Sequence, residues 1–175
     1  HWGATSQDIV DTGMVLLQRD AYQVILRDMK ACLGYCLDLA KKYNHTVMAG
    51  RTHVVHAIPI TFGYKAAVWA DELGRDIERI EAVAPRVFVG EMSGAVGTLA
   101  SQPEKGLETQ KRMMEILGLG VPTIAWHVAR DSQAEFASVL ALCAGTLGRI
   151  NHEILTLQRT EILELEEPFF MGKVG

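Results

Sequence analysis

The chain has 175 residues, of which 49% are hydrophobic and 22% are charged, with 17 Lys and Arg against 21 Asp and Glu. This composition is typical of one globular domain with a sizeable core, and it excludes a disordered chain. The formal net charge of −4 leaves no basic face for a polynucleotide backbone, so we expect no nucleic-acid partner.

The cysteines and the hydropathy pattern bear on the cellular compartment. Cys32, Cys36 and Cys143 are odd in number and lack metal-ligand spacing, so we expect packed thiols of a reducing cytosol. No run of about 18 uncharged apolar residues occurs, and the first residues resemble no signal peptide. We therefore expect a cytoplasmic protein that does not associate with membranes.

The first predicted element is a long helix over residues 8–43. This segment contains no proline, and its apolar residues fall on most of the helix circumference. So broad an apolar surface indicates a helix that is buried on several sides. Asn44 and a loop over residues 50–59 are expected to interrupt the helical pattern.

A second helix is predicted over residues 61–84, because apolar residues recur on one face at three- and four-residue spacing. Pro85 is expected to bend or briefly interrupt it. The glycines that follow mark a stretch where the backbone comes close to a packed helix or a ligand: Gly90, Gly94 and Gly97.

Two further helices complete the predicted fold. A short one covers residues 103–117, with proline in its first turn and glycines after its end. A longer one covers residues 132–164 and carries a coiled-coil-like seam. Residues 1–175 are thus predicted to form a single all-α domain, a bundle of long helices. The apolar surface of these helices exceeds what the bundle can cover, so we expect self-association. The seam consists of Phe136, Leu140, Cys143, Leu147, Ile150, Ile154 and Leu157.

The most distinctive chemistry lies in residues 50–59, where two histidines three residues apart follow an arginine. A histidine can exchange a proton near neutral pH, and Arg51 can hold an anionic substrate meanwhile. On residue type alone, a histidine such as His53 is more often a structural residue than a catalytic one. His56 fits substrate contact and hydrogen bonding within the loop equally well.

Several motifs, in order and spacing, resemble the fumarase/aspartase superfamily. Residues 50–65 resemble the histidine loop of its adenylosuccinate lyase branch, and residues 1–12 resemble the superfamily's His-x-Gly-x-Thr-Ser-x-Asp segment. Residues 92–97, 130–131 and 157–169 are similar to further landmarks of this superfamily. The resemblance covers nearly all 175 residues and implies substrate-site segments at residues 1–12, 50–65, 90–101 and 126–131.

The resemblance also implies an architecture and an assembly. The expected fold is the central-domain bundle of the L-aspartase-like type, as a fragment of a longer enzyme. The superfamily builds a homotetramer around a core of long helices, with each active site shared by three subunits. Its catalytic base is a serine on a mobile loop, which we expect just beyond Gly175.

Specific roles follow from the matched motifs. The resemblance makes His53 the general acid that protonates the leaving nitrogen. Several binding residues also have a structural alternative. Ser6 suits a helix cap, and Lys65 suits a solvated surface position. Ser93 suits close helix packing, and Arg130 suits an exposed ion pair before a helix that Asp131 caps. The implied substrate-binding set is His1, Thr5, Ser6, Arg51, Thr52, His56, Lys65, Ser93 and Arg130.

The acidic residues near the end of the chain raise the question of a metal site. On a helix, their spacing would spread the carboxylates around the circumference, which favours a solvated terminus over metal coordination. We expect neither a metal nor an organic cofactor. The residues concerned are Glu161, Glu164, Glu166 and Glu167.

The expected activity is a β-elimination that cleaves a carbon–nitrogen bond of a small anionic substrate and releases fumarate, as in the adenylosuccinate lyase branch of purine biosynthesis. The 3-carboxy-cis,cis-muconate cycloisomerase branch is the alternative, because residues 126–127 resemble it more closely, although those enzymes lack a histidine at the position of His53. A helical oligomerisation scaffold is the non-enzymatic alternative, but it leaves the matched polar motifs unexplained.

Overall fold

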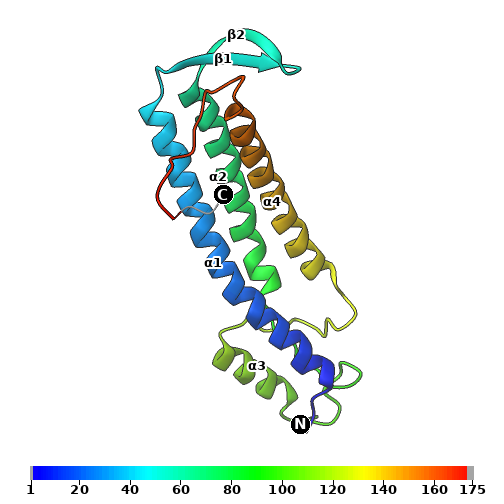
Figure 1. The fold of residues 1–175 in the computed structure, drawn as a ribbon. Helices are drawn as coiled ribbons and strands as arrows, with labels where there is room; N and C mark the ends of the chain where they lie inside the picture. The colour runs from blue at the N-terminus through cyan, green and yellow to red at the C-terminus, as the bar shows by residue number, and fades with distance from the viewer. Residues whose placement is uncertain (1, 173–175) are drawn as a thin grey trace. The chain divides into compact units, whose positions relative to one another are not determined.

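The computed structural model describes residues 2–172 (Figure 1). The predicted all-α architecture is confirmed, with a small antiparallel sheet added to it. The first helix is the longest at 37 residues, and the last has 27. In chain order the elements are α1 (Ser6–Lys42), β1 (Val47–Thr52), β2 (Val55–Thr61), α2 (Phe62–Val87), α3 (Gly106–Leu117) and α4 (Asp131–Leu157).

The chain forms two compact units. Unit 1 comprises residues 1–30 and 77–140, and unit 2 comprises residues 31–76 and 141–175. Helices α1, α2 and α4 contribute residues to both units, whereas α3 belongs to unit 1 and the β-hairpin to unit 2. Each unit therefore combines segments that are far apart in the sequence.

The core of unit 1 gathers apolar residues from α1, α3 and the loops around them. Val15 and Met114 are fully buried, and Met92 and Leu119 pack with them. Ring contacts extend this core from Tyr22 through Phe88 to Phe136, with centroid separations of 5.0 and 5.9 Å. Edge-on aromatic pairs of this kind add to the stabilisation that burial provides.

One stripe of α1 is buried rather than several sides. The buried positions 8, 15, 22 and 29 are seven residues apart and therefore share one helix face. The predicted burial on several sides is wrong for this chain taken alone, since large hydrophobic side chains on the other faces remain exposed: Ile9, Val10, Leu17 and Val24.

Helix α3 begins at Gly106, three residues later than predicted, and ends as predicted. Gly118 adopts the left-handed conformation with φ 63°, and its N–H and that of Leu119 donate to the Glu115 and Met114 carbonyls. Glycine accepts this conformation without the steric cost that a side chain would add.

The predicted loop at residues 50–59 is instead most of a two-stranded β-hairpin. Val47 pairs with Thr61 and Thr52 with Val55, and a register shift occurs at Gly50. A Cβ at Gly50 would meet the Ile58 carbonyl, so this irregularity needs glycine. Pro59 does not break the strand because both strands of a two-stranded ribbon are edges, and β-branched residues favour strands.

Helix α4 carries the predicted seam in a shifted form and is shorter than expected. Phe136, Cys143, Ile150 and Leu157 are buried as predicted, but Thr146 is buried in place of Leu147. The helix ends at Leu157 instead of residue 164, because the chain folds back and the N–H groups of residues 164 and 165 both donate to the Leu157 carbonyl.

Helix α2 behaves differently at its proline. It continues past Pro85 to Val87, so the expected interruption does not occur. The next turn is still closed, because Phe88 N–H donates to the Ala84 carbonyl at 3.0 Å. A proline this close to a helix end removes few intrahelical hydrogen bonds.

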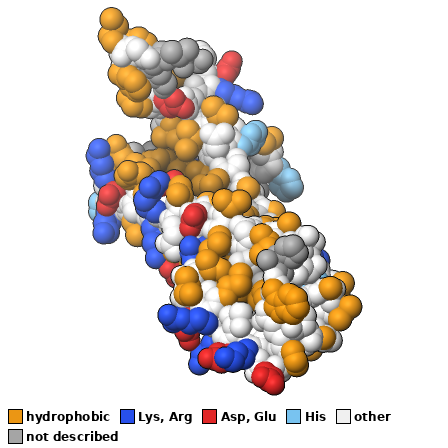
Figure 2. All heavy atoms as spheres, turned by 90° about the horizontal axis from the view of Figure 1, so that it is seen from below, with side chains coloured by type: hydrophobic (Ala, Val, Ile, Leu, Met, Phe, Trp, Pro, Cys, Tyr) orange, Lys and Arg blue, Asp and Glu red, His pale blue; other side chains and the backbone are white. Residues whose placement is uncertain are grey.

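Large hydrophobic side chains remain on the surface of both units, and Figure 2 shows them between clusters of charge. In unit 2 they include Tyr35, Leu142 and Leu155, which are 69%, 54% and 53% exposed. Exposed apolar side chains in such number are typical of surfaces that another protein covers. Among the described residues, no helix has the length and hydropathy needed to cross a membrane.

The core of unit 1 makes a testable prediction. Met114→Ala should lower the free energy of unfolding of the full-length protein by about 2–5 kcal/mol, because it leaves a cavity among fully packed neighbours. Ile116→Ala, on an exposed position of the same helix, should change it by less than about 0.5 kcal/mol. Urea unfolding measures both, and equal effects would contradict the assigned core.

Candidate active site

Asp8, on the first turn of α1, organises the polar interior of unit 1. Its side chain is fully buried. Oδ1 accepts the Ser93 N–H at 3.1 Å and contacts His127 Nε2 at 2.7 Å. Oδ2 accepts the N–H groups of Thr5 at 2.8 Å and Gly94 at 3.1 Å. One carboxylate therefore holds together three of the segments that the sequence predicts at the substrate site.

A second buried carboxylate, Glu91, continues this network. Its Oε1 accepts the Ser93 hydroxyl, and its Oε2 accepts the Trp126 N–H at 2.6 Å. The backbone of Glu91 exchanges two hydrogen bonds with the Thr12 hydroxyl on α1, and the Trp126 indole N–H donates to the Gly90 carbonyl at 3.0 Å. We refer to Asp8, Glu91 and these partners as the carboxylate network.

The ionised form of Asp8 is stabilised within this network. Burial opposes ionisation, but the hydrogen bonds from Thr5, His127, Ser93 and Gly94 outweigh it and lower the pKa of the carboxyl group. A carboxylate that accepts several N–H groups is stabilised in its charged state. Asp8 is thus a fixed negative charge inside unit 1.

Asp8, Glu91 and His127 also bring possible metal ligands together, with one ligand atom of each within 4.8 Å of the others. Four hydrogen-bond contacts already engage the two Asp8 oxygens, and two more engage Glu91. A carboxylate has about four acceptor positions, so an ion would have to displace these contacts. The donor set therefore fits a hydrogen-bonded network better than a metal centre.

Arg130 lies beside the carboxylate network at the start of α4. Its guanidinium forms two hydrogen bonds with the buried Asp11 carboxylate, at 2.8 and 3.1 Å, and lies 5.6 Å from the Trp126 ring centroid. These contacts hold the guanidinium in place while its side chain remains 43% exposed. Asp131 follows as the first residue of α4 rather than its cap.

Thr5 and Ser6 line an open hollow on unit 1. Its volume is about 570 Å³, and Ala4, Ile9 and Val10 complete its wall. Ser6 begins α1, so backbone N–H groups of the first helical turn lie next to its hydroxyl. Hydroxyls beside a helix start are suited to anionic ligands.

The histidine segment of unit 2 forms the tip of the β-hairpin. His53 and Val54 occupy the two turn positions, with φ values of 49° and 60°. Such a turn normally takes Asn and Gly, and a β-branched residue in the left-handed region is strained. Thr52, His53 and His56 are exposed, so the hairpin presents both imidazoles to the surroundings of the unit. Strain of this kind is typical of functional segments.

Two cations predicted to bind substrate are engaged within unit 2. Arg51 Nη1 lies 2.6 Å from Glu164 Oε2, and Lys65 pairs with Glu153. The hydrogen bond from Arg51, aided by the Ala49 N–H, lowers the pKa of Glu164 despite partial burial. The sequence suggested that Glu164 lies at a solvated helix end. The structure places it in an ion pair instead.

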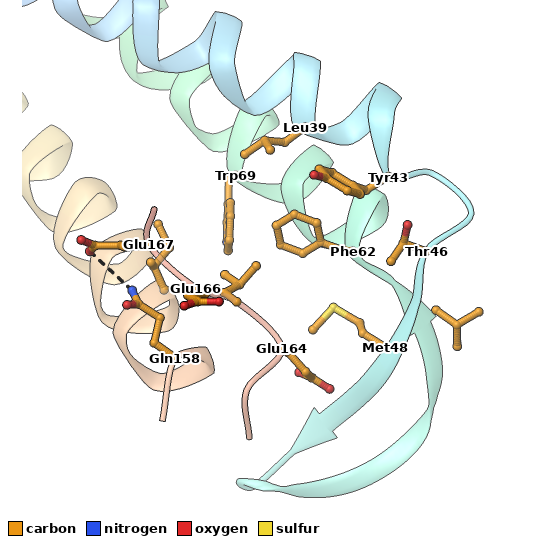
Figure 3. Close-up of a pocket in the computed structure, with 13 residues that line it drawn as sticks. Leu39, Tyr43, Thr46, Met48, Phe62, Trp69, Gln158, Glu164, Glu166 and Glu167 are labelled. Atoms are coloured by element: carbon orange, nitrogen blue, oxygen red, sulfur yellow. Dashed lines mark hydrogen bonds between the residues drawn. The ribbon is translucent and has the colours of Figure 1, made fainter. Parts of the chain in front are cut away.

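Unit 2 also contains a cavity of about 550 Å³ (Figure 3). The rings of Phe62 and Trp69 line it from α2, and the Tyr43 ring lines it from the turn after α1. Three carboxylates line it from the segment after α4: Glu164, Glu166 and Glu167. His53, His56 and Lys65 are not among its lining residues. The side chain predicted to act as the acid is therefore not part of this cavity.

The structure thus divides the predicted site residues between the units. Thr5, Ser6, Ser93 and Arg130 fall in unit 1, while Arg51, Thr52, His53, His56 and Lys65 fall in unit 2, and His1 lies outside the described residues. Their roles toward substrate stay predictions.

Two of these residues have surroundings that the sequence did not indicate. Ser93 is 2% exposed, and its hydroxyl donates to the Glu91 carboxylate. His53 lies in the turn before β2, and Lys65 lies in the first turn of α2. The extended strand between them spans up to about 20 Å.

Sequence reasoning missed Asp8, Glu91 and His127. Asp8 lies inside the matched first motif, but nothing in its spacing shows that it is fully buried. His127 follows Trp126 in a segment where the sequence indicates only a family resemblance. One signal was available: Asp8 lies seven residues before Val15 and so shares its helix face, where a charged residue needs polar partners.

Comparison with known proteins shows the family of the chain. The family described as "Lyase" matches residues 1–175. The chain is 51% identical to the N-acetyl-S-(2-succino)cysteine lyase of Enterococcus italicus, over all of this chain and 38% of the relative. It is 47% identical to the adenylosuccinate lyase of Pyrococcus abyssi, over all of this chain and 39% of that enzyme.

A solved structure shows the same fold. The 3-carboxy-cis,cis-muconate lactonizing enzyme of Pseudomonas putida superposes with a TM-score of 0.94 at 40% identity, covering 98% of this chain and 39% of that one. The chain belongs to the lyase family of the fumarase/aspartase superfamily. It spans less than two fifths of the length of these relatives.

The Asp8 hydrogen bonds predict a pH-dependent contribution to stability. Asp8→Asn should lower the free energy of unfolding on the order of 3 kcal/mol at neutral pH, because an amide cannot accept all four contacts. Since the folded-state pKa of Asp8 is lowered, its contribution is complete above the unfolded-state pKa and is lost as pH falls through the folded-state value.

Urea unfolding of wild-type and variant full-length protein from neutral to strongly acidic pH measures this difference. The gap between them should narrow as the solution is acidified. Asp20→Asn is the matched control, because the Asp20 side chain is 73% exposed on the same helix. A gap that stays constant across this range would contradict the assignment.

Proposed function

We propose that the full-length protein is an elimination lyase that cleaves a succinyl conjugate and releases fumarate, with N-acetyl-S-(2-succino)cysteine as its substrate. The observation that carries the proposal is the 51% identity to an enzyme named for that substrate, across every residue of this chain. A second relative of the same name, from Dickeya dadantii, is 48% identical. This replaces a carbon–nitrogen bond with a carbon–sulfur bond as the preferred target.

The reaction needs an acid and a base on opposite sides of the succinyl group. A base removes a proton from the carbon next to the one that bears sulfur, and the electron pair forms the double bond of fumarate. The carbon–sulfur bond breaks, and the thiol of N-acetylcysteine leaves with a proton from the acid. Cations and N–H donors stabilise the charge that develops on the substrate carboxylates.

We assign the acid to His53. It is exposed on a strained hairpin tip, where an imidazole can reach a ligand bound elsewhere. We assign Thr5, Ser6 and Arg130 to the substrate carboxylates, since they surround or adjoin the open hollow and the carboxylate network of unit 1. The base is expected on the serine loop that the superfamily resemblance places beyond this segment.

Adenylosuccinate is the second candidate substrate. The 47% identity to the Pyrococcus enzyme and the histidine motif of that branch favour it. Both substrates carry the same succinyl group, so the anion-binding residues proposed here serve either one. The leaving groups differ: a purine nucleotide leaves through nitrogen in adenylosuccinate, and N-acetylcysteine leaves through sulfur in the other compound. With adenylosuccinate as substrate, the pathway would be purine biosynthesis.

The assay of full-length protein on both compounds decides between them. We expect fumarate and N-acetylcysteine from N-acetyl-S-(2-succino)cysteine, with kcat/KM at least about tenfold higher than for adenylosuccinate, because one extra ring system must be excluded from or fitted into the site. Mass spectrometry detects each product. The reverse preference would assign the adenylosuccinate reaction, and turnover of 3-carboxy-cis,cis-muconate alone would assign the cycloisomerase branch.

We further propose that the protein acts in the cytoplasm as a homotetramer whose active sites are shared between copies. The hydrophobic side chains exposed on α1 and α4 support self-association. The hairpin that carries His53 extends its imidazoles away from unit 2. A site completed by another copy would account for both features.

Substitution of the acid tests this assignment. His53→Gln in the full-length protein should lower kcat on the order of 10²-fold or more, because the lost proton donor acts in the transition state. His45→Gln removes another exposed histidine of unit 2 and should leave kcat unchanged. Unchanged turnover in His53→Gln would remove His53 from the mechanism.

Mixed oligomers extend this test to the sharing of sites. His53→Gln and Ser6→Ala proteins, each impaired alone, should recover part of the activity when refolded together. Recovery is expected only if one site combines the hairpin of one copy with unit 1 of another. A mixture no more active than its components would argue for sites within single copies.

A further inference from the structure

His127 is the residue of the carboxylate network for which the proposed reaction has no role. It lies in the loop between α3 and α4, three residues before Arg130. Its side chain is 16% exposed, whereas the Asp8 side chain it contacts is fully buried. The imidazole is therefore mostly buried and keeps a small accessible surface.

The two ring nitrogens face different surroundings. Nε2 lies 2.7 Å from Asp8 Oδ1, and since an ionised carboxylate only accepts, Nε2 carries the hydrogen of this bond. Nδ1 has no hydrogen-bond partner among the described residues. It is nevertheless not a buried, unsatisfied atom, so it keeps some contact with solvent. Nδ1 is therefore the nitrogen that can meet a ligand.

The position of His127 relative to the predicted binding residues follows from the shared carboxylate. Thr5 N–H and His127 bind the two oxygens of the same Asp8 group, at 2.8 and 2.7 Å. His127 is thus fixed beside the segment whose Thr5 and Ser6 line the hollow of unit 1. Arg130, held by Asp11, approaches the same loop through its contact with the Trp126 ring.

We propose that His127 is a substrate-contacting residue of this site, whose Nδ1 hydrogen-bonds a carboxylate of the succinyl group. The inference rests on the proposed function. Asp8 is the positioning residue: it fixes the ring through Nε2 and offsets the charge of an imidazolium that donates from both nitrogens, as the aspartate of a catalytic triad does. This arrangement adds a charge-assisted contact to those of Thr5, Ser6 and Arg130.

The alternative is that His127 only satisfies the buried Asp8 carboxylate. His127→Gln separates the two roles, because the glutamine amide nitrogen can replace Nε2 toward Asp8 while nothing replaces Nδ1. In full-length enzyme we expect unfolding near that of wild type, KM raised about tenfold to hundredfold and kcat changed less. Full retention of KM would overturn the proposal. His45→Gln is the matched control.

Succinate binding measured by calorimetry gives a readout that needs no turnover. We expect His127→Gln to weaken succinate binding by a factor similar to the change in KM. If wild type binds succinate and His127→Gln weakens that binding while no elimination occurs, the proposed function fails and this inference stands. If wild type turns over substrate and both proteins bind succinate equally, this inference fails and the function stands. If wild type neither turns over nor binds succinate, both are overturned.

A measurement on wild-type protein keeps the test decisive if the variant does not fold. Diethyl pyrocarbonate modifies accessible imidazole nitrogens, and mass spectrometry locates the modified residues. Succinate should protect His127 and leave the exposed His45 reactive. Equal modification of His127 with and without succinate would overturn the proposal.

Discussion

The interior of unit 1 depends on one constraint, the need to satisfy a carboxylate from which water is excluded. Asp8 is fully buried, and an unpaired charge in such a place would cost several kcal/mol. Contacts from Thr5, Ser93, Gly94 and His127 satisfy it instead. The loops that supply these groups are fixed as a consequence. A polar network of this extent at the end of a helix is difficult to explain as packing alone, which is why it favours a ligand site over a scaffold.

Unit 2 distributes its polar groups in the opposite way. Two of its cations are paired with carboxylates, Arg51 with Glu164 and Lys65 with Glu153. The tip of its hairpin is exposed, with His53 in a strained turn.

The sequence predicted the helices well and the hairpin poorly, for physical reasons. Helical periodicity is a property of neighbouring turns, so α1, α3 and the start of α2 could be located to within a few residues, and the glycine end of α3 was correct. Pairing of Val47 with Thr61 depends on contacts across the hairpin, and Gly50 and Pro59 concealed it. The motifs located His53, Thr5 and Ser6, but burial of Asp8 and orientation of His127 depend on residues about 85 to 119 positions away. No local pattern encodes such distances.

Those same sequence separations constrain the order in which the protein can fold. Three of the four partners of Asp8 lie 85, 86 and 119 residues further along the chain. Closing loops of this length costs conformational entropy before the contacts stabilise the structure, so the contacts of this carboxylate form late. During synthesis, the first turn of α1 leaves the ribosome long before residues 93–127 exist to receive it. Asp8 therefore stays hydrated on the nascent chain, and unit 1 closes around it only after three quarters or so of this segment has been made.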